Sequence, residues 1–180
     1  MVLSVIFNSP FVSAGGSKSA QCPVGLVSGM TLDEEFGPGT QQATRCIKVR
    51  EKVKVVFVLN KLCANATCTQ CYGINNIENV IEDYEITHGM SRADYDIVVV
   101  LYGPSYPLVL NNQSPTPHAS TNPFQAKIQG LLDKGIKIQF CQNTARAQIV
   151  KFNQLMPGIT FVTGGITATA DYQALGYSVI

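Results

Sequence analysis

Two short apolar runs constrain the fold of this chain more than any other feature. Residues Val53–Leu59 and Asp96–Tyr102 are rich in β-branched and aromatic side chains and show little polar alternation. Such runs are typical of strands that are buried on both faces of a parallel sheet. The second run ends at Gly103 and Pro104, which mark a turn. We therefore expect a sheet with helices on both of its faces.

Weaker strand patterns and helical stripes alternate with these runs. Three more strands are predicted at 136–140, 159–163 and 177–180. Apolar residues recur at helical spacing over 74–84 and 124–132, and shorter helices are predicted over 145–152 and 167–174. Alternating strands and helices with right-handed crossovers indicate an α/β fold, a three-layer sandwich with a mainly parallel five-stranded sheet.

One predicted helix carries explicit start and stop residues. Asn122 and Pro123 supply a cap and a first-turn proline for the helix over 124–132, and Gly135 supplies its stop.

The first fifty residues follow no such pattern. They are rich in Gly, Ser, Thr and Pro, and we expect an irregular N-terminal extension over 1–50, flexible or ordered by a partner subunit, before an α/β domain over 51–180. The apolar start Val2–Phe7 is too short to span a bilayer and suits a strand or assembly arm. Phe11–Gly15 resembles a small-residue cleavage site, so the extension is also partly signal-like, although no basic residue precedes the apolar start.

Composition and motifs exclude several classes of function. The 180 residues carry a formal net charge of +1 and no basic run, which argues against a nucleic-acid partner. The chain has no serine elbow, P-loop or pair of carboxylates at catalytic spacing. Gly164 and Gly165 are interpreted as a turn at a strand end, and His88 and His118 as surface residues.

Cys141 is the strongest candidate for chemistry. It lies where the strand-like run 136–140 meets a helix-like run that opens at Gln142. A thiol in that position meets unpaired backbone N–H groups and the positive end of a helix dipole, and both favour the thiolate. The alternative, a small buried apolar side chain at a strand end, has equal weight on this geometry alone.

Five blocks of the segment after Lys52 resemble the DsrE/DsrF-like family of sulfur-relay proteins. The most specific block places a cysteine directly after a glycine-led strand and follows it with an Asn-Thr pair. The others resemble the first helix of the family, the turn after its second strand, its Pro-Gly strand entry and its closing segment. The blocks are Leu132–Thr144, Gly73–Val80, Tyr102–Pro104, Pro157–Ile159 and Tyr172–Tyr177.

This resemblance implies a function for Cys141. Members of the family accept sulfane sulfur as a cysteine persulfide and pass it from a donor protein to an acceptor protein, which makes this chain a sulfurtransferase if it is catalytic. The resemblance also implies assembly with other copies or related subunits. Family members commonly carry a basic residue close to the cysteine, and Arg146 is the candidate here, although a solvated helix arginine is the favoured interpretation. The family requires neither residues 1–50 nor the cysteines discussed next.

A second group of cysteines, Cys63, Cys68 and Cys71, has the spacing of the first three ligands of a plant-type ferredoxin cluster. Zinc fits the same ligands, with Cys22 or Cys46 as a fourth, and Cys141 is a further candidate for a cluster. Disulfides are the preferred interpretation: a Cys68–Cys71 redox pair, or bridges from Cys22 or Cys46 to this loop. A metal ion or cluster ranks second, and free thiols third. No other cofactor is expected.

Three hypotheses for function follow. The leading one is a sulfur relay through Cys141. The first alternative is a structural or assembly subunit with disulfide-bridged cysteines, and the second is an iron–sulfur or metal-binding electron carrier. The compartment is cytoplasmic or periplasmic/extracellular, and disulfides would favour the latter. Two glycosylation-like sequences, at Asn65 and Asn112, do not decide between them.

Overall fold

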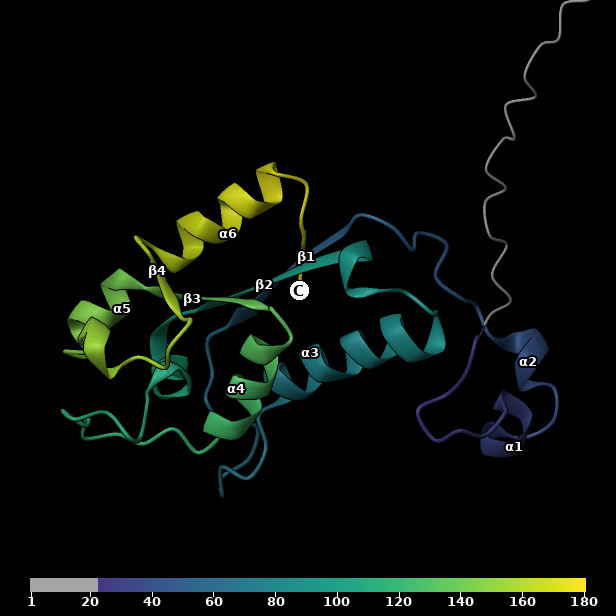
Figure 1. Cartoon of the computed structure of the whole chain (residues 1–180), viewed down its shortest axis with the longest axis horizontal. Helices are drawn as coiled ribbons and strands as arrows, with labels where there is room; N and C mark the ends of the chain where they lie inside the picture. The colour runs from purple at the N-terminus through teal and green to yellow at the C-terminus, as the bar shows by residue number, and fades with distance from the viewer. Residues whose placement is uncertain (1–22) are drawn as a thin grey trace, which may run out of the picture.

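The computed structural model describes residues 23–180 and contains a five-stranded sheet in which every pairing is parallel. The strand order is β4-β3-β2-β1-β5, with β1 at Val53–Leu59, β2 at Tyr95–Leu101, β3 at Lys137–Cys141, β4 at Thr160–Val162 and β5 at Ser178–Val179 (Figure 1). The predicted α/β architecture is confirmed, and each observed strand overlaps the predicted one.

Helices cover both faces of the sheet, which gives the three predicted layers. Figure 1 shows α6 on one side of the strands and α3 and α4 on the other. The helices of the domain are α3 at Tyr72–Glu82, which continues as the π-helix Asp83–Thr87, α4 at Gln125–Asp133, α5 at Gln142–Ala147 and α6 at Gly165–Ala174. Three 3-10 segments lie at Arg92–Asp94, Gly103–Val109 and Phe152–Gln154.

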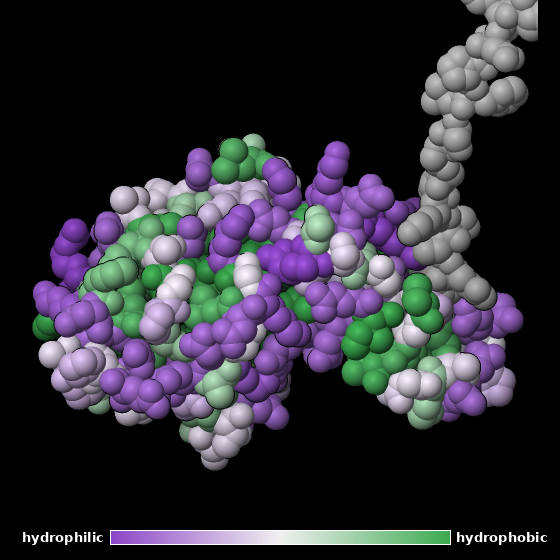
Figure 2. Space-filling model, in the orientation of Figure 1, coloured by the Kyte–Doolittle hydropathy of each residue, from purple (hydrophilic) through white to green (hydrophobic). Residues whose placement is uncertain are grey.

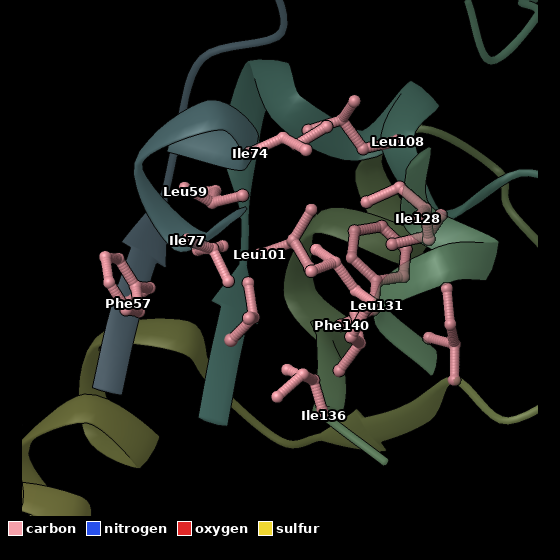
Figure 3. Packing of buried hydrophobic residues seen from close by; sticks show 14 of the residues in the cluster. Phe57, Leu59, Ile74, Ile77, Leu101, Leu108, Ile128, Leu131, Ile136 and Phe140 are labelled. Carbon is pink, nitrogen blue, oxygen red and sulfur yellow. The ribbon is translucent and has the colours of Figure 1, made fainter. Parts of the chain in front are cut away.

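Alternation along the central strands divides the core into two parts. On the face of the sheet covered by α3 and α4, alternate strand residues such as Phe57 and Leu101 pack against Ile77 and Ile128, as Figure 3 shows. The residues between them point to the opposite face, on the α6 side, and form a smaller cluster: Val56, Val98 and Val100. Because both faces are covered, polar residues are rare in these strands, which explains why the apolar runs carried the fold prediction.

Two predicted helix boundaries are wrong. The helix expected from Pro123 begins at Gln125, because the side chain of Asn122 is buried in a turn. Its amide donates to the carbonyl oxygens of Leu108 and Leu110 and its oxygen accepts from the N–H of Phe124. The helix expected over 145–152 lies at Gln142–Ala147, and Ile149 just beyond it has a left-handed φ of 57°.

The extension, predicted as irregular, contains two short helices among residues 23–50. They are α1 at Leu32–Phe36 and α2 at Thr40–Ala43. A capping box between Thr31 and Glu34 starts α1, a local pattern that the sequence carries and the prediction overlooked. Figure 1 shows both helices in a small lobe beyond the end of α3. The predicted arm at Val2–Phe7, the cleavage-like Phe11–Gly15 and Cys22 lie outside the described residues.

His88 is buried beneath this extension, so its interpretation as a surface residue is wrong. Its Nε2 accepts a hydrogen bond from the N–H of Ile47 at 3.3 Å, which leaves the proton on Nδ1 for the carbonyl oxygen of Asp83 at 2.8 Å. Val24 also donates to the carbonyl oxygen of Thr87 at 2.7 Å. The extension is thus attached to the end of the π-helix. His118 is half-buried and bonds to the carbonyl oxygen of Gln148.

Within residues 23–180, the helices fall short of the length and apolarity that a bilayer crossing requires.

Candidate functional site

Cys141 lies at the junction that the sequence predicted. It is the last residue of β3, where it pairs with Val162 of β4, and it is also the N-cap of α5, with extended backbone angles. The carboxyl ends of neighbouring parallel strands meet at one edge of the sheet, which is where α/β folds gather their functional groups. Residues that follow β2, β3 and β4 therefore all lie near this sulfur.

Four N–H and O–H groups lie near the Sγ atom of Cys141 and act to lower its pKa. Two are the N–H groups of Asn143 and Thr144 at the start of α5, the third is the Thr144 hydroxyl, and the fourth is the N–H of Gly165 at the start of α6. Burial of the thiol acts to raise its pKa, but these donors stabilise the thiolate more strongly, and the pKa of Cys141 is lowered below the ordinary value of 9.0. The site therefore favours an ionised sulfur.

The hydroxyl of Thr144 is oriented by a neighbouring loop. The N–H of Gly103, directly after β2, donates to Thr144 Oγ1 at 2.9 Å. In that hydrogen bond the Thr144 hydroxyl is the acceptor, so the hydroxyl proton is free to point at Cys141 Sγ. The ends of β2 and β3 are thereby linked through one side chain, and Thr144 acts as a positioning residue.

Gly165 is required by close packing rather than by its backbone angles. A Cβ atom at this position would lie 2.6 Å from Cδ1 of Tyr102 and 2.9 Å from its Cβ, which no relaxed side chain tolerates. The missing side chain lets the first turn of α6 approach the ring and brings the Gly165 N–H to the sulfur. The sequence interpretation of Gly164 and Gly165 as a turn therefore missed a part of the site. The sequence does carry one feature that could have indicated this role of Gly165, namely a glycine pair between a predicted strand and a predicted helix.

A cavity of about 440 Å³ adjoins the sulfur. Tyr102, Asn143, Thr163 and Thr167 contribute to its wall beside Cys141. Although Cys141 as a whole is buried, it borders this cavity, so a small group attached to its sulfur would have room.

Arg146 stands apart from this cavity. It is exposed in the last turn of α5, and its Nη1 donates to Oδ1 of Asn143 at 3.4 Å. It does not line the cavity, and its link to the sulfur runs through Asn143, whose N–H is one of the four donors. The predicted catalytic role of Arg146 is therefore not supported by a direct contact with Cys141.

Comparisons with known proteins identify the family of this chain. The family model described as DsrE/DsrF-like family matches residues 52–180, which is most of the chain. The chain belongs to the DsrE/DsrF-like family.

Two solved structures share the fold of this DsrE/DsrF-like chain. One is MTH1491 from Methanobacterium thermoautotrophicum, titled a protein of unknown function, with 20% identity, a TM-score of 0.57, and coverage of 72% of this chain and 98% of that one. The other is the ychN protein from E. coli, with 15% identity, a TM-score of 0.52, and coverage of 71% and 96%. At these identities the likeness concerns the fold alone. No curated protein sequence matches the chain.

The second cysteine group of this DsrE/DsrF-like protein lies in the loop between β1 and α3. Cys63 and Cys68 form a disulfide, and Cys71 is an unpaired, buried thiol at the N-cap of α3. Neither the Cys68–Cys71 pair nor a bridge from the extension to Cys63 or Cys68 is therefore formed. Cys46 is also disulfide-bonded.

A metal site on these three cysteines requires a different state of the loop. Thiolates, not disulfide sulfurs, ligate zinc and iron–sulfur clusters, so the bridged pair does not fit either group. Among the described residues, no group of three or more His, Cys, Asp or Glu side chains is arranged to hold a metal ion. The metal site on Cys63, Cys68 and Cys71 stays a prediction for the reduced protein.

The two unpaired cysteines among residues 23–180 should react at different pH. Burial raises the pKa of Cys71 above its ordinary value of 9.0, and donors from Ile74 and Gly73 only partly oppose it, whereas the pKa of Cys141 is lowered. Only the thiolate is nucleophilic, so as the pH rises we expect iodoacetamide to label Cys141 first and Cys71 later. Peptide mass spectrometry of samples labelled at successive pH values measures the order. Earlier labelling of Cys71 would contradict the electrostatic account of the site.

Proposed function

We propose that this protein is a sulfur carrier that holds sulfane sulfur on Cys141 as a persulfide. The Cys141 thiolate attacks the terminal sulfur of a donor persulfide, R–S–SH, which forms Cys141–S–SH and releases R–S⁻. An acceptor thiolate then takes the terminal sulfur by the same exchange, and Cys141 returns as thiolate. The sequence of two exchanges is redox-neutral and needs a donor and an acceptor protein but no resident cofactor.

The observation that carries the proposal is the set of four donors around one sulfur. A persulfide is an anion near neutral pH, as a thiolate is, so N–H and O–H donors that favour one also favour the other. The cavity beside Cys141 offers room for a further sulfur atom. Family membership is an independent support, because it rests on the match of residues 52–180 and not on the donors.

Removal of the thiol tests this proposal directly. The parent protein, incubated anaerobically with a small-molecule persulfide, should gain the mass of one sulfur atom, and Cys141→Ser should gain none. The matched control is Cys71→Ser, which removes the other unpaired thiol and should load as the parent does. Intact-protein mass spectrometry distinguishes them. Equal loading of Cys141→Ser and parent would refute the assignment.

A second candidate function, an assembly subunit, is favoured by exposed apolar side chains on the extension. Val24, Val27, Met30 and Phe36 are 42–63% exposed, and Figure 2 shows hydrophobic surface on the lobe that carries α1 and α2. Large exposed apolar groups of this kind mark interaction sites. Phe36→Lys should lower the mass measured by light scattering. Leu175→Lys should not, because Leu175 is also exposed but is the C-cap of α6. A parent that is monomeric at all concentrations would reject this candidate.

The disulfides favour an oxidising compartment for either function. Structural disulfides persist in periplasmic and extracellular proteins and are rare in the cytosol, where thiols are kept reduced. Cys46, Cys63 and Cys68 are all bonded in this way. We therefore place the protein outside the cytosol as part of this proposal.

A further inference from the structure

A second sulfur-containing cavity lies at the carboxyl end of β1, apart from the Cys141 site. It has a volume of about 180 Å³, and both Cys63 and Cys71 belong to its wall, together with Leu59, Tyr72 and Gly73. One of these cysteines is half of a disulfide, and the other is a free thiol. The cavity therefore brings an electrophilic sulfur and a nucleophilic one to the same space.

The backbone of the loop explains why these two residues share a cavity. The N–H of Ala64 donates to the carbonyl oxygen of Gln70 at 2.7 Å, which draws together the two ends of the loop over 63–71. Cys63 and Cys71 directly flank this hydrogen-bonded pair. Gly73 contributes too, because a Cβ there would lie 2.2 Å from Cδ2 of Leu59, so only glycine lets the start of α3 pack this closely against β1.

Cys71 is placed to act as the attacking thiolate. It is the N-cap of α3, and the N–H groups of Gly73 and Ile74 and the positive charge of Lys127 act to lower its pKa. Burial raises the pKa of Cys71, so most of the thiol is protonated at neutral pH, and these groups stabilise the thiolate once it forms. An exchange reaction at Cys71 should therefore be slow at neutral pH and faster in alkali.

We propose that Cys63, Cys68 and Cys71 form a thiol–disulfide exchange site that presents Cys68 as a reactive thiol. The Cys71 thiolate attacks Sγ of Cys63, the Cys63–Cys71 disulfide forms, the Cys63–Cys68 disulfide breaks, and Cys68 leaves as thiolate. The step is an exchange within the chain, so it consumes no oxidant or reductant. The reverse attack by Cys68 restores the observed state.

The position of Cys68 suits the role of released thiol. Cys68 is half-buried in a loop whose neighbours Thr67 and Thr69 are exposed, whereas Cys71 is buried. Its φ of 54° is left-handed, a conformation that residues with a Cβ rarely adopt, and opening of the bridge frees it to relax. The site thus exchanges a buried thiol for one near solvent.

The substrate class of this site is an external disulfide, R–S–S–R′. The Cys68 thiolate attacks one of its sulfurs, forms Cys68–S–S–R and releases R′–S⁻, which leaves the electron count balanced. This reaction uses none of the groups around Cys141, so the inference goes beyond the proposed sulfur relay and does not rest on it.

Differential labelling of the unmodified protein tests the exchange. The full chain is held at about pH 9, where thiolates are well populated, and the exchange is then quenched in acid. The protein is denatured in the presence of N-ethylmaleimide, which alkylates the free thiols. Reduction and iodoacetamide then label the bridged cysteines. Trypsin leaves all three in one peptide, 62–92, so fragment ions show which cysteine was free. We expect a mixture of maleimide on Cys71 and on Cys68, and label on Cys71 alone would overturn the proposal.

A variant gives an independent measurement. In Cys68→Ser, oxidised glutathione should take two electrons and two protons from Cys63 and Cys71, leave as two molecules of reduced glutathione, and leave the two cysteines bridged. The protein mass should fall by two hydrogen atoms. The control Cys141→Ser should give the same mixture of labels as the parent. Cys63 and Cys71 that stay separately glutathionylated or free in a folded Cys68→Ser protein would overturn the proposal. If this variant does not fold, the labelling of the parent decides.

Discussion

Gly165→Ala is expected to slow the alkylation of Cys141 at neutral pH by about tenfold or more. The added Cβ would overlap the ring of Tyr102, at 2.6 Å from Cδ1, so the first turn of α6 must move away from β3. That movement withdraws the Gly165 N–H from Cys141 Sγ. A hydrogen bond to a charged group contributes about 1.5–3 kcal/mol, and about 1.4 kcal/mol corresponds to one pKa unit. The pKa of Cys141 should therefore rise by roughly one to two units.

The rate of iodoacetamide alkylation as a function of pH measures this effect. The midpoint of the profile for Cys141 should move to higher pH, while the limiting rate in strong alkali changes much less, because the thiolate itself stays accessible. The matched control is Gly130→Ala on the exposed side of α4, where a Cβ would meet nothing within 4 Å. That variant should leave the profile of Cys141 unchanged. An unshifted profile in Gly165→Ala would show that Gly165 does not contribute to the ionisation of the sulfur.

The fold was predictable from the sequence because each strand is recognisable within one short segment of the chain. The runs that become β1 and β2 are buried on both faces, so nearly every residue of each strand is apolar, and no tertiary knowledge was needed to find them. The position of Cys141 was also predictable, since it depends only on the end of one strand and the start of the next helix. The extension was harder, because α1 and α2 are each about one turn long and leave no stripe.

The rest of the site depends on contacts between distant segments. Gly165 reaches the sulfur only because β4 pairs with β3 and α6 then turns back over the sheet, and a glycine pair alone has many simpler interpretations. The burial of His88 likewise requires the extension to pack on the π-helix. For Cys63, Cys68 and Cys71, the spacing allowed several pairings, and Cys63–Cys68 is the one observed. Spacing limits the choices in such cases, and packing selects among them.

Phe140, the residue before Cys141, should contribute strongly to stability: Phe140→Ala is expected to lower the free energy of unfolding by about 3–5 kcal/mol. Phe140 is fully buried (Figure 3), and its ring stacks on that of Phe161, with 6.0 Å between the ring centroids. Truncation leaves a cavity in the core beside the sheet, because β3 is held between β2 and β4 and cannot collapse into the space.

Urea unfolding followed by circular dichroism measures the loss, and the midpoint should fall while the slope stays constant. Phe152→Ala is the matched control, because Phe152 also lies beside Phe161, at 6.0 Å between centroids, but is 69% exposed. Its loss should cost no more than about 1 kcal/mol. Similar losses in the two variants would mean that the sheet relaxes around Phe140. In that case β3 would not hold Cys141 rigidly at the strand end, and the ionisation of the sulfur would need another explanation.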